Sequence, residues 1–464
     1  MTGTRILRIE LRRSVALRAG LLIAAVGVFV LFASNPPYQS WMELVVVQRD
    51  IMQLTWPLAL AAGAWQARRE RASRVEELVT TTPKPRRRRV LPIAAAMAIG
   101  AVAAYLVMFA GATPHLQHPD AYFPRGAVPI IALGALAMVA AVWLGLAIGT
   151  LLPSPLTAPV LVVTGFVALA LLPNVLVPFN VGRPGTWLLF PHLQSPRDGL
   201  YALQTLSARA NLSQGAWLAA VAATGLAVFA ASRPRTRIAA VVPVVLGVAI
   251  AVPTMPRQLA DAWVPDHGAT ELVCTSDQPT VCIARVHSHT LDQLRGPTRQ
   301  ALAILAARLP AAPTRVVVET DGHRTEGPPP ADTLLIRMWP FATDAELTGA
   351  PVDWMLDGAG VPPCSSILGF DPFTVAAFGQ DVEPDIRYLA ARRAATAWLL
   401  ERDLPPAPLG GKESEDTLAP LALAALRGLP PDEQQARVAA LRDAELTCAP
   451  GDRLDLLTGP SGLP

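Results

Sequence analysis

The chain has 464 residues, of which 52% are hydrophobic and only 16% are charged, and its mean hydropathy is +0.37. This composition excludes an ordinary soluble protein and predicts that much of the chain lies in a membrane. The net charge of +3 hides an uneven distribution, since residues 1–255 carry 22 of the 39 Lys and Arg residues but only 8 of the 36 Asp and Glu residues. A basic, apolar part therefore precedes an acidic, more polar part.

Seven apolar runs are long enough, or nearly so, to cross a bilayer as helices of about 17–25 residues. They lie at about Val15–Ala33, Val45–Gln66, Val90–Gly111, Ala127–Leu152, Ala158–Val177, Gly215–Ser232 and Ile238–Met255. The second run is the least regular, because we expect Arg49 and Asp50 at its outer boundary and a kink at Pro57.

The basic residues predict the orientation of these runs. Of the 22 that precede position 256, 17 fall in Arg5–Arg18, Arg68–Arg89 and Arg233–Arg237, three segments that alternating spans put on one side. Cations beside spans stay on the cytoplasmic side, so we expect this side and the N-terminus to face the cytoplasm. An odd number of spans then places the region from about Pro256 on the opposite, extracytoplasmic side of the membrane.

All four cysteines, Cys274, Cys282, Cys364 and Cys448, lie in that outer region. An even number of cysteines confined to one outer part indicates disulfides in an oxidising compartment. Pairing Cys274 with Cys282 would close a short hairpin-like loop and leave Cys364 for Cys448, although four cysteines allow three connectivities. Four unrelated buried thiols are the alternative.

The outer region, of about 200 residues, is large enough for a domain with its own core. The apolar pattern predicts strands at Val281–Val286, Arg315–Glu319 and Thr333–Trp339, and helices at Leu291–Leu309, Asp385–Leu404 and Asp432–Thr447. We therefore expect an α-helical polytopic membrane protein with a six-span core at 1–237, a seventh span at 238–255 and a mixed α+β extracytoplasmic domain at 256–464.

A basic, polar segment, Gln66–Arg89, separates the second and third apolar runs. Its first half is expected to be helical, because Val75, Leu78 and Val79 recur at the spacing of one helical face, and Thr82-Pro83 ends the helix. A small apolar stripe on a charged helix fits a groove of a partner protein. The alternative is that the charges only anchor the two neighbouring spans.

The outer region holds no catalytic motif, neither the H-E-x-x-H zinc motif nor the G-x-S-x-G nucleophile motif. His287 and His289 alternate along a strand-like run, but two surface histidines beside a disulfide explain them better than a metal site. A phosphate-binding loop is also missing, because Pro406 replaces the required glycine and Glu413 replaces the Ser or Thr that holds magnesium. We therefore expect no enzyme, no metal and no cofactor in this chain, and a partner must supply the energy for any transport.

Together these features resemble the type-2 permease subunit of ATP-binding-cassette (ABC) exporters. The resemblance is carried by Ala67–Arg71 and Arg74–Pro83 after the second span, by Leu144-Gly145 with Gly149, and by the turn Pro153–Pro159. A basic interfacial helix before the first span and an apolar, re-entrant-like outer segment before the sixth add to it. In that family the charged helix between spans two and three is the coupling helix, which docks on a separate ATPase subunit.

The resemblance covers about residues 5–237 and implies six core helices, a homo- or heterodimer of permease subunits, and two cytoplasmic ATPase subunits that bind ATP and Mg²⁺. It assigns the coupling contact to Arg71, Arg74, Val75, Glu77, Leu78 and Val79. It implies export or extrusion of a hydrophobic or amphipathic cargo across the bacterial plasma membrane, in the arrangement of high-GC Gram-positive members, with no nucleic acid as partner. The competing hypothesis is a membrane-anchored receptor or assembly scaffold that presents the acidic outer domain.

Overall fold

The computed structural model describes residues 10–11, 15–33, 37–72, 86–175, 190–193, 200–231, 233–257, 261–320, 330–338, 352–363, 385–405 and 414–459. The chain divides into two compact units, Met1–Ala269 and Thr270–Pro464. The three-part division expected from the sequence is finer, and its boundaries stay a prediction.

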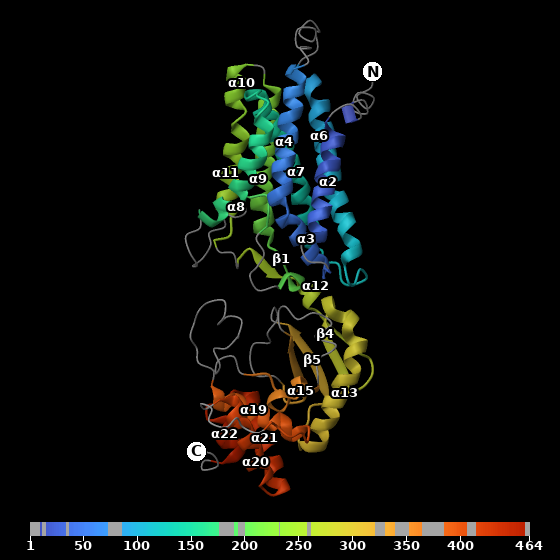
Figure 1. The fold of residues 1–464 in the computed structure, drawn as a ribbon, viewed down its shortest axis with the longest axis vertical. Coiled ribbons are helices and arrows are strands. Elements are labelled where there is room, and N and C mark those ends of the chain that lie inside the picture. The colour runs from blue at the N-terminus through green and yellow to red at the C-terminus, as the bar shows by residue number, and fades with distance from the viewer. Residues whose placement is uncertain are drawn as a thin grey trace. The chain divides into compact units, whose positions relative to one another are not determined.

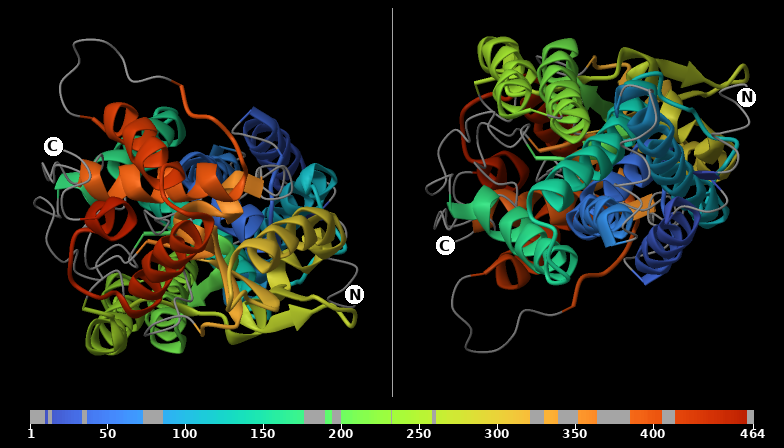
Figure 2. Two further views of the ribbon diagram at one scale, coloured as in Figure 1. Left: turned by 90° about the horizontal axis from the view of Figure 1, so that it is seen from below. Right: turned by 90° about the horizontal axis from the view of Figure 1, so that it is seen from above.

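The first unit consists mainly of long helices (Figure 1). In chain order they are α2 (Ala16–Ala33), α3 (Trp41–Asp50), α4 (Met52–Ala72), α6 (Arg86–Ala112), α7 (Ala127–Leu151), α8 (Thr157–Val175), α9 (Ala208–Ala230), α10 (Pro234–Ala239) and α11 (Val242–Thr254). The right-hand view in Figure 2 looks at this bundle from above. Helix α7 contacts α4, α6 and α9, so it forms the centre of the bundle.

Short elements lie near one end of these helices and complete the first unit (Figure 1). They are η1 (Thr113–His115), η3 (Leu200–Leu203), β1 (Gln204–Leu206), β2 (Trp263–Pro265) and α12 (His267–Thr270). Strands β1 and β2 pair antiparallel, with Thr205 opposite Val264. This pairing ties the chain before α9 to the chain after α11.

Within the described residues, five helical segments are long and apolar enough to cross a membrane: Ala16–Ala33, Val90–His115, Ala127–Leu151, Ala208–Ala230 and Arg235–Thr254. They correspond to the first, third, fourth, sixth and seventh expected runs. The fifth run corresponds to α8, whose apolar stretch Thr157–Leu171 is shorter. The chain is thus a multi-pass membrane protein by the length and composition of its helices, while the six-span core stays a prediction.

The second expected run is not one continuous helix, and this prediction was wrong. Helix α3 ends at Asp50, and α4 begins at Met52 and runs through Pro57. The interruption lies at Ile51, whose N–H donates to the carbonyl oxygens of both Val47 and Arg49, as in a tightened last turn. We attribute it to Arg49, whose side chain is held inside the unit rather than at an outer boundary.

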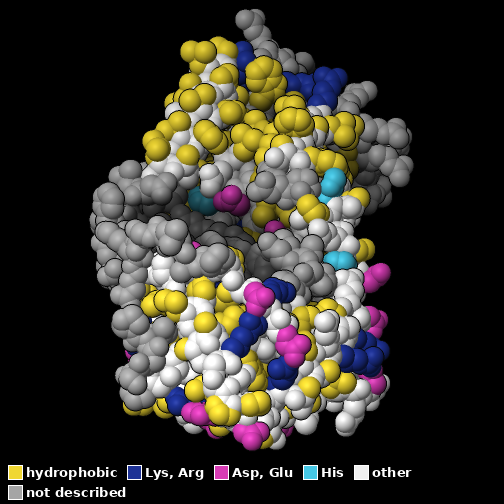
Figure 3. Space-filling view, turned by 60° about the horizontal axis from the view of Figure 1, so that its bottom comes forward, with side chains coloured by type: hydrophobic (Ala, Val, Ile, Leu, Met, Phe, Trp, Pro, Cys, Tyr) yellow, Lys and Arg dark blue, Asp and Glu magenta, His cyan; other side chains and the backbone are white. Residues whose placement is uncertain are grey.

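Hydrophobic side chains, yellow in Figure 3, gather over the helices of the first unit on the face shown. Large hydrophobic side chains that are exposed on these helices include Leu21, Phe29, Val163, Phe166, Leu246 and Ile250. Contiguous apolar surface of this extent is typical of helices that face lipid.

The second unit is built on a four-stranded sheet in the order β3-β4-β5-β6. Its strands are β3 (Leu272–Cys274), β4 (Thr280–Ala284), β5 (Arg315–Thr320) and β6 (Thr333–Met338); β3 is antiparallel to β4, and the other neighbours are parallel. The short helix η4 (Arg285–Thr290) and then α13 (Leu291–Arg308) connect β4 to β5. The strands expected around Val281, Arg315 and Thr333 and the helix expected from Leu291 are confirmed, whereas His287 and His289 lie in η4 and not on a strand.

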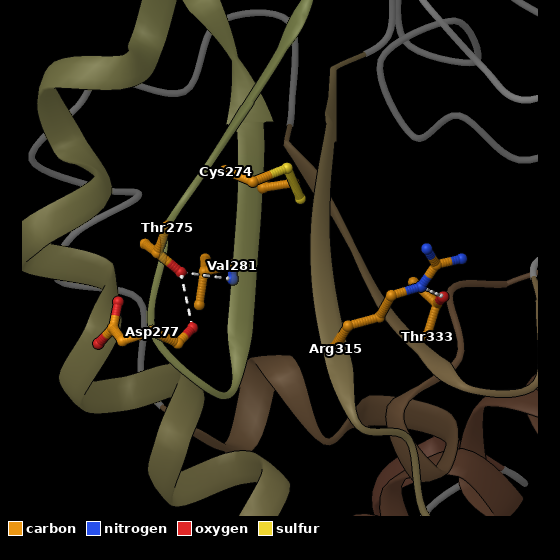
Figure 4. Close-up of a disulfide and its surroundings, with 7 residues drawn as sticks. Cys274, Thr275, Asp277, Val281, Arg315 and Thr333 are labelled. Carbon is orange, nitrogen blue, oxygen red and sulfur yellow. Dashed lines mark hydrogen bonds between the residues drawn. A yellow bond between two sulfur atoms is a disulfide. The ribbon is translucent and has the colours of Figure 1, made fainter.

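A disulfide joins Cys274 to Cys282, which face each other across β3 and β4 (Figure 4). Beside it, the Thr275 hydroxyl oxygen accepts the Val281 N–H at 3.0 Å and so closes the turn between these strands. The expected pairing of these two cysteines is confirmed. Cys448 is also disulfide-bonded, and its expected partner, Cys364, lies outside the described residues.

Helices form the rest of the described second unit. They are α15 (Val352–Met355), α16 (Asp357–Gly360), α19 (Ile386–Leu399), α20 (Glu415–Arg427), α21 (Pro431–Thr447) and α22 (Arg453–Thr458). They share one apolar core with the sheet, which includes Ile283, Leu305, Val316, Leu334, Ala391 and Leu441. The helices expected from Asp385 and Asp432 correspond to α19 and α21, whereas α20 was not expected.

Candidate functional site: a buried arginine in the first unit

The coupling residues expected from the sequence are largely beyond the described structure. Arg71 belongs to the last turn of α4, but its side chain is not described. Arg74, Val75, Glu77, Leu78 and Val79 lie outside the described residues. The segment that contains them connects the end of α4 to the start of α6, and its contacts stay a prediction.

A different set of polar side chains meets inside the first unit, around Arg49 at the end of α3. The Arg49 side chain is fully buried. Its Nη1 donates to the carbonyl oxygen of Ile130 in α7 at 3.1 Å, and its Nη2 donates to the carbonyl oxygen of Pro191 at 2.6 Å and to Gln214 Oε1 in α9 at 3.1 Å. One guanidinium therefore links α3 to two helices and to a non-helical segment.

That non-helical segment, residues 190–193, is held by α3 and α9 together. Gln214 accepts from Arg49 through Oε1 and donates through Nε2 to the carbonyl oxygen of Phe190 at 3.1 Å. Pro191, His192 and Leu193 are buried. Non-helical backbone within a membrane protein requires such internal partners, because lipid offers none. Three of these four residues are therefore buried inside the first unit.

Two further residues, Gln48 and Tyr105, complete what we call the Arg49 cluster: Gln48, Arg49, Tyr105, His192 and Gln214. Gln48 Nε2 donates to the carbonyl oxygen of Tyr105 in α6 at 2.8 Å. The Tyr105 hydroxyl packs against Gly134, where an added Cβ would lie 2.1 Å from that oxygen and 3.0 Å from Arg49 Cδ. Gly134 thus leaves the space that the phenol of Tyr105 and the aliphatic part of the Arg49 side chain share.

Four buried polar atoms of the Arg49 cluster have no hydrogen-bond partner among the described residues. They are Gln48 Oε1, Arg49 Nε, Tyr105 Oη and His192 Nδ1. Folded proteins leave few buried polar atoms unpaired, so four of them around one guanidinium require an explanation.

Arg49 is the charged residue of the Arg49 cluster. Burial, and then the charge of Arg49, lower the pKa of His192 from 6.5 to about 4, so its imidazole is neutral near pH 7. Every hydrogen-bond partner of Arg49 in the described chain is a neutral oxygen, and no carboxylate of the described residues pairs with it. A buried cation without a counter-charge is costly, and in membrane proteins it commonly marks a functional position.

Comparison with known proteins adds no assignment, because no protein-family model, no curated protein and no solved structure matches the chain. The sequence did contain a signal for this site, since Gln48 and Arg49 interrupt an otherwise apolar run. The outer boundary expected at Arg49 and Asp50 is wrong for Arg49, whose side chain is buried. The partners of Gln48 and Arg49 on α6, α7 and α9 could not be identified from local sequence.

Proposed function

We propose that the protein is the membrane subunit of an ABC exporter or extruder, in which a separate cytoplasmic ATPase binds the segment between α4 and α6. ATP and Mg²⁺ belong to that partner, and a second permease subunit completes the transporter. The cargo is a hydrophobic or amphipathic molecule, and the basic ends of the helices face the cytoplasm of a bacterial cell.

The observation that supports this proposal best is the close packing of α4 against α7. A Cβ added at Gly145 would lie 2.0 Å from the Leu60 carbonyl oxygen, and one at Gly63 would lie 2.2 Å from the Val142 carbonyl oxygen. Small residues allow such close approach of helix backbones in membranes. Because α4 runs directly into the proposed ATPase-binding segment, a force applied there would move α4 and α7 as one body.

The helix ends give a second line of support. The helices alternate in direction, so the end of α4, the start of α6 and helix α10 lie at one end of the first unit (Figure 1). Exposed Arg235 and Arg237 of α10 lie at this end, where α6 begins with four consecutive arginines in its sequence. A common basic end is what a cytoplasmic face would carry.

The test of the proposal replaces both Leu78 and Val79 by aspartate. We expect the double variant to insert normally but to lose binding of the ATPase, since carboxylates in a desolvated groove cost several kcal/mol unless they find partners. The measurement is co-purification of a cytoplasmic ATPase with each variant, followed by cargo-stimulated ATP hydrolysis in lipid. Arg87→Ala with Arg88→Ala is the control, because Lys84, Arg86 and Arg89 preserve the cationic anchor. Normal ATPase binding by the aspartate variant would contradict the proposal and would mean that the charges of this segment only anchor the two neighbouring spans.

The proposed orientation has a separate test in intact cells. A membrane-impermeant thiol reagent should label Cys274, which is exposed, only after the Cys274–Cys282 disulfide is reduced. A cysteine introduced at exposed Arg235 should be labelled only after the cells are permeabilised. The opposite labelling pattern would show that the protein has the opposite orientation in the membrane.

A further inference from the structure

Two of the four unpaired atoms of the Arg49 cluster can donate a hydrogen bond, and the cluster carries a positive charge that no described carboxylate compensates. Arg49 Nε can only donate, and the Tyr105 hydroxyl can donate, yet neither finds an acceptor. The three oxygens that Arg49 does contact are neutral. An anion with two or more oxygens would satisfy the free donors and compensate the charge at once.

Of the three oxygens that Arg49 contacts, one belongs to the backbone of a helix and two do not. The Ile130 carbonyl belongs to α7, whereas the Pro191 carbonyl belongs to a non-helical segment and the Gln214 amide to a side chain. The last two can be released without breaking a helix. Anionic oxygens that take their place would make charge-assisted bonds, which are roughly twice as strong as neutral ones, and a guanidinium matches a phosphate or carboxylate through two parallel bonds.

The surroundings of the cluster are apolar. Met42, Val45, Val46, Ile130 and Leu193 form one buried hydrophobic group that includes the neighbours of Arg49 on α3. A free, fully hydrated anion would have to lose its water to enter such a place. An anion attached to an apolar chain would gain from the same surroundings.

We infer that the Arg49 cluster binds one anionic head group, a phosphate or a carboxylate, of an amphipathic molecule, and that residues 190–193 close the site when it is empty. This inference deepens the proposed function, because it names the chemical class of the cargo. Arg49 pairs with the anion, the Tyr105 hydroxyl donates to it, and the Pro191 carbonyl holds Arg49 in the empty state.

The test uses the purified full-length chain in a neutral detergent, with decyl phosphate as the probe and the thermal unfolding midpoint as the readout. Decyl phosphate should raise the midpoint of the wild-type protein, whereas decyltrimethylammonium should not. In Tyr105→Phe the half-maximal concentration should be about tenfold higher, which is the loss expected for one hydrogen bond to a charged group. Without ligand this variant should be as stable as the wild type, since the hydroxyl it loses has no partner.

Tyr38→Phe is the matched control. The Tyr38 hydroxyl is buried and donates to the carbonyl oxygen of Leu31 at 2.8 Å, away from the Arg49 cluster. Its loss should lower the midpoint but leave the concentration dependence on decyl phosphate unchanged. Arg49→Lys, which keeps the charge and loses the planar fork, should weaken binding at least as much as Tyr105→Phe.

An equal response of Tyr105→Phe and wild type to decyl phosphate, or an equal effect of the cationic amphiphile, would overturn the inference. If inorganic phosphate alone raises the unfolding midpoint as much as decyl phosphate does, the site binds a free anion, and the inference that its ligand is amphipathic is wrong. The measurement needs no ATPase. A failed ATPase-binding test with an intact response to decyl phosphate would therefore refute the proposed function alone, and the reverse result would refute this inference alone.

Discussion

Replacing Glu445 by glutamine is expected to destabilise the second unit by about 3–5 kcal/mol, because the change removes a buried anion from between two buried arginines. Glu445 is fully buried and accepts from Arg392 Nη1, from Arg453 Nε, both at 2.7 Å, and from the Tyr388 hydroxyl at 2.6 Å. Burial alone would lower the pKa of Arg392, but Asp357, Tyr388 and Glu445 together raise it above its ordinary value.

The two arginines would respond differently to this loss. Arg392 keeps a second carboxylate, since its Nη2 donates to Asp357 at 2.7 Å. The other partners of Arg453 in the described chain are carbonyl oxygens, so its charge would be left uncompensated. Because Arg453 belongs to α22 and Glu445 to α21, we expect these two helices to separate first.

Hydrogen–deuterium exchange of the full-length protein measures this effect. Amides of α21 and α22 should exchange roughly a hundredfold faster or more in Glu445→Gln, as a loss of about 3 kcal/mol in opening free energy requires. Glu433→Gln is the matched control on the same helix, because Glu433 forms a half-exposed pair with Arg437 at 3.0 Å. Such a pair contributes about 0.2–1 kcal/mol. Equal exchange in the two variants would contradict the importance of the buried network.

Much of the second unit could be predicted because its elements carry regular patterns. The apolar residues of β4, β5, β6 and α13 repeat at strand or helix spacing, and the short separation of Cys274 and Cys282 pointed to their disulfide. Strand β3 has three residues, which is too short for an alternating pattern to be recognised. Helix α20 was missed although Ser414 precedes it and Glu415 and Asp416 stand in its first turn, which are ordinary signals of a helix start.

The polar interiors of the two units could not be predicted from the sequence. Glu445 is one of several charged residues in α21, and nothing nearby distinguishes it from exposed Asp443, because its partners come from α19 and α22. Arg49 has partners 81, 142 and 165 residues away. A prediction from hydropathy puts a cation at the end of a span, because the hydropathy pattern contains no information about the distant carbonyl groups that stabilise a buried cation. Such residues are identified only when the tertiary contacts are known.

Gly145→Leu is expected to separate α4 from α7 and to prevent the first unit from folding as a stable bundle. An added Cβ would lie 2.0 Å from the Leu60 carbonyl oxygen and 2.9 Å from its carbon, both of them backbone atoms that cannot move without the helix. Overpacking against side chains costs about 1–3 kcal/mol, and a contact with backbone should cost at least as much. Gly149 and Gly63 make similar contacts on the same two helices, so the pair has little room to shift.

The thermal unfolding midpoint and the fraction of monodisperse protein in detergent measure this change, with Gly215→Leu in α9 as the matched control. An added Cβ at Gly215 would meet only the end of the Leu133 side chain, at 3.2 Å, which can rotate away. We therefore expect Gly215→Leu to retain most of the wild-type stability and Gly145→Leu to lose it. If Gly145→Leu also retains most of the wild-type stability, then α4 and α7 can move apart freely. In that case they could not transmit motion as one body, and the main structural support for the proposed coupling would be lost as well.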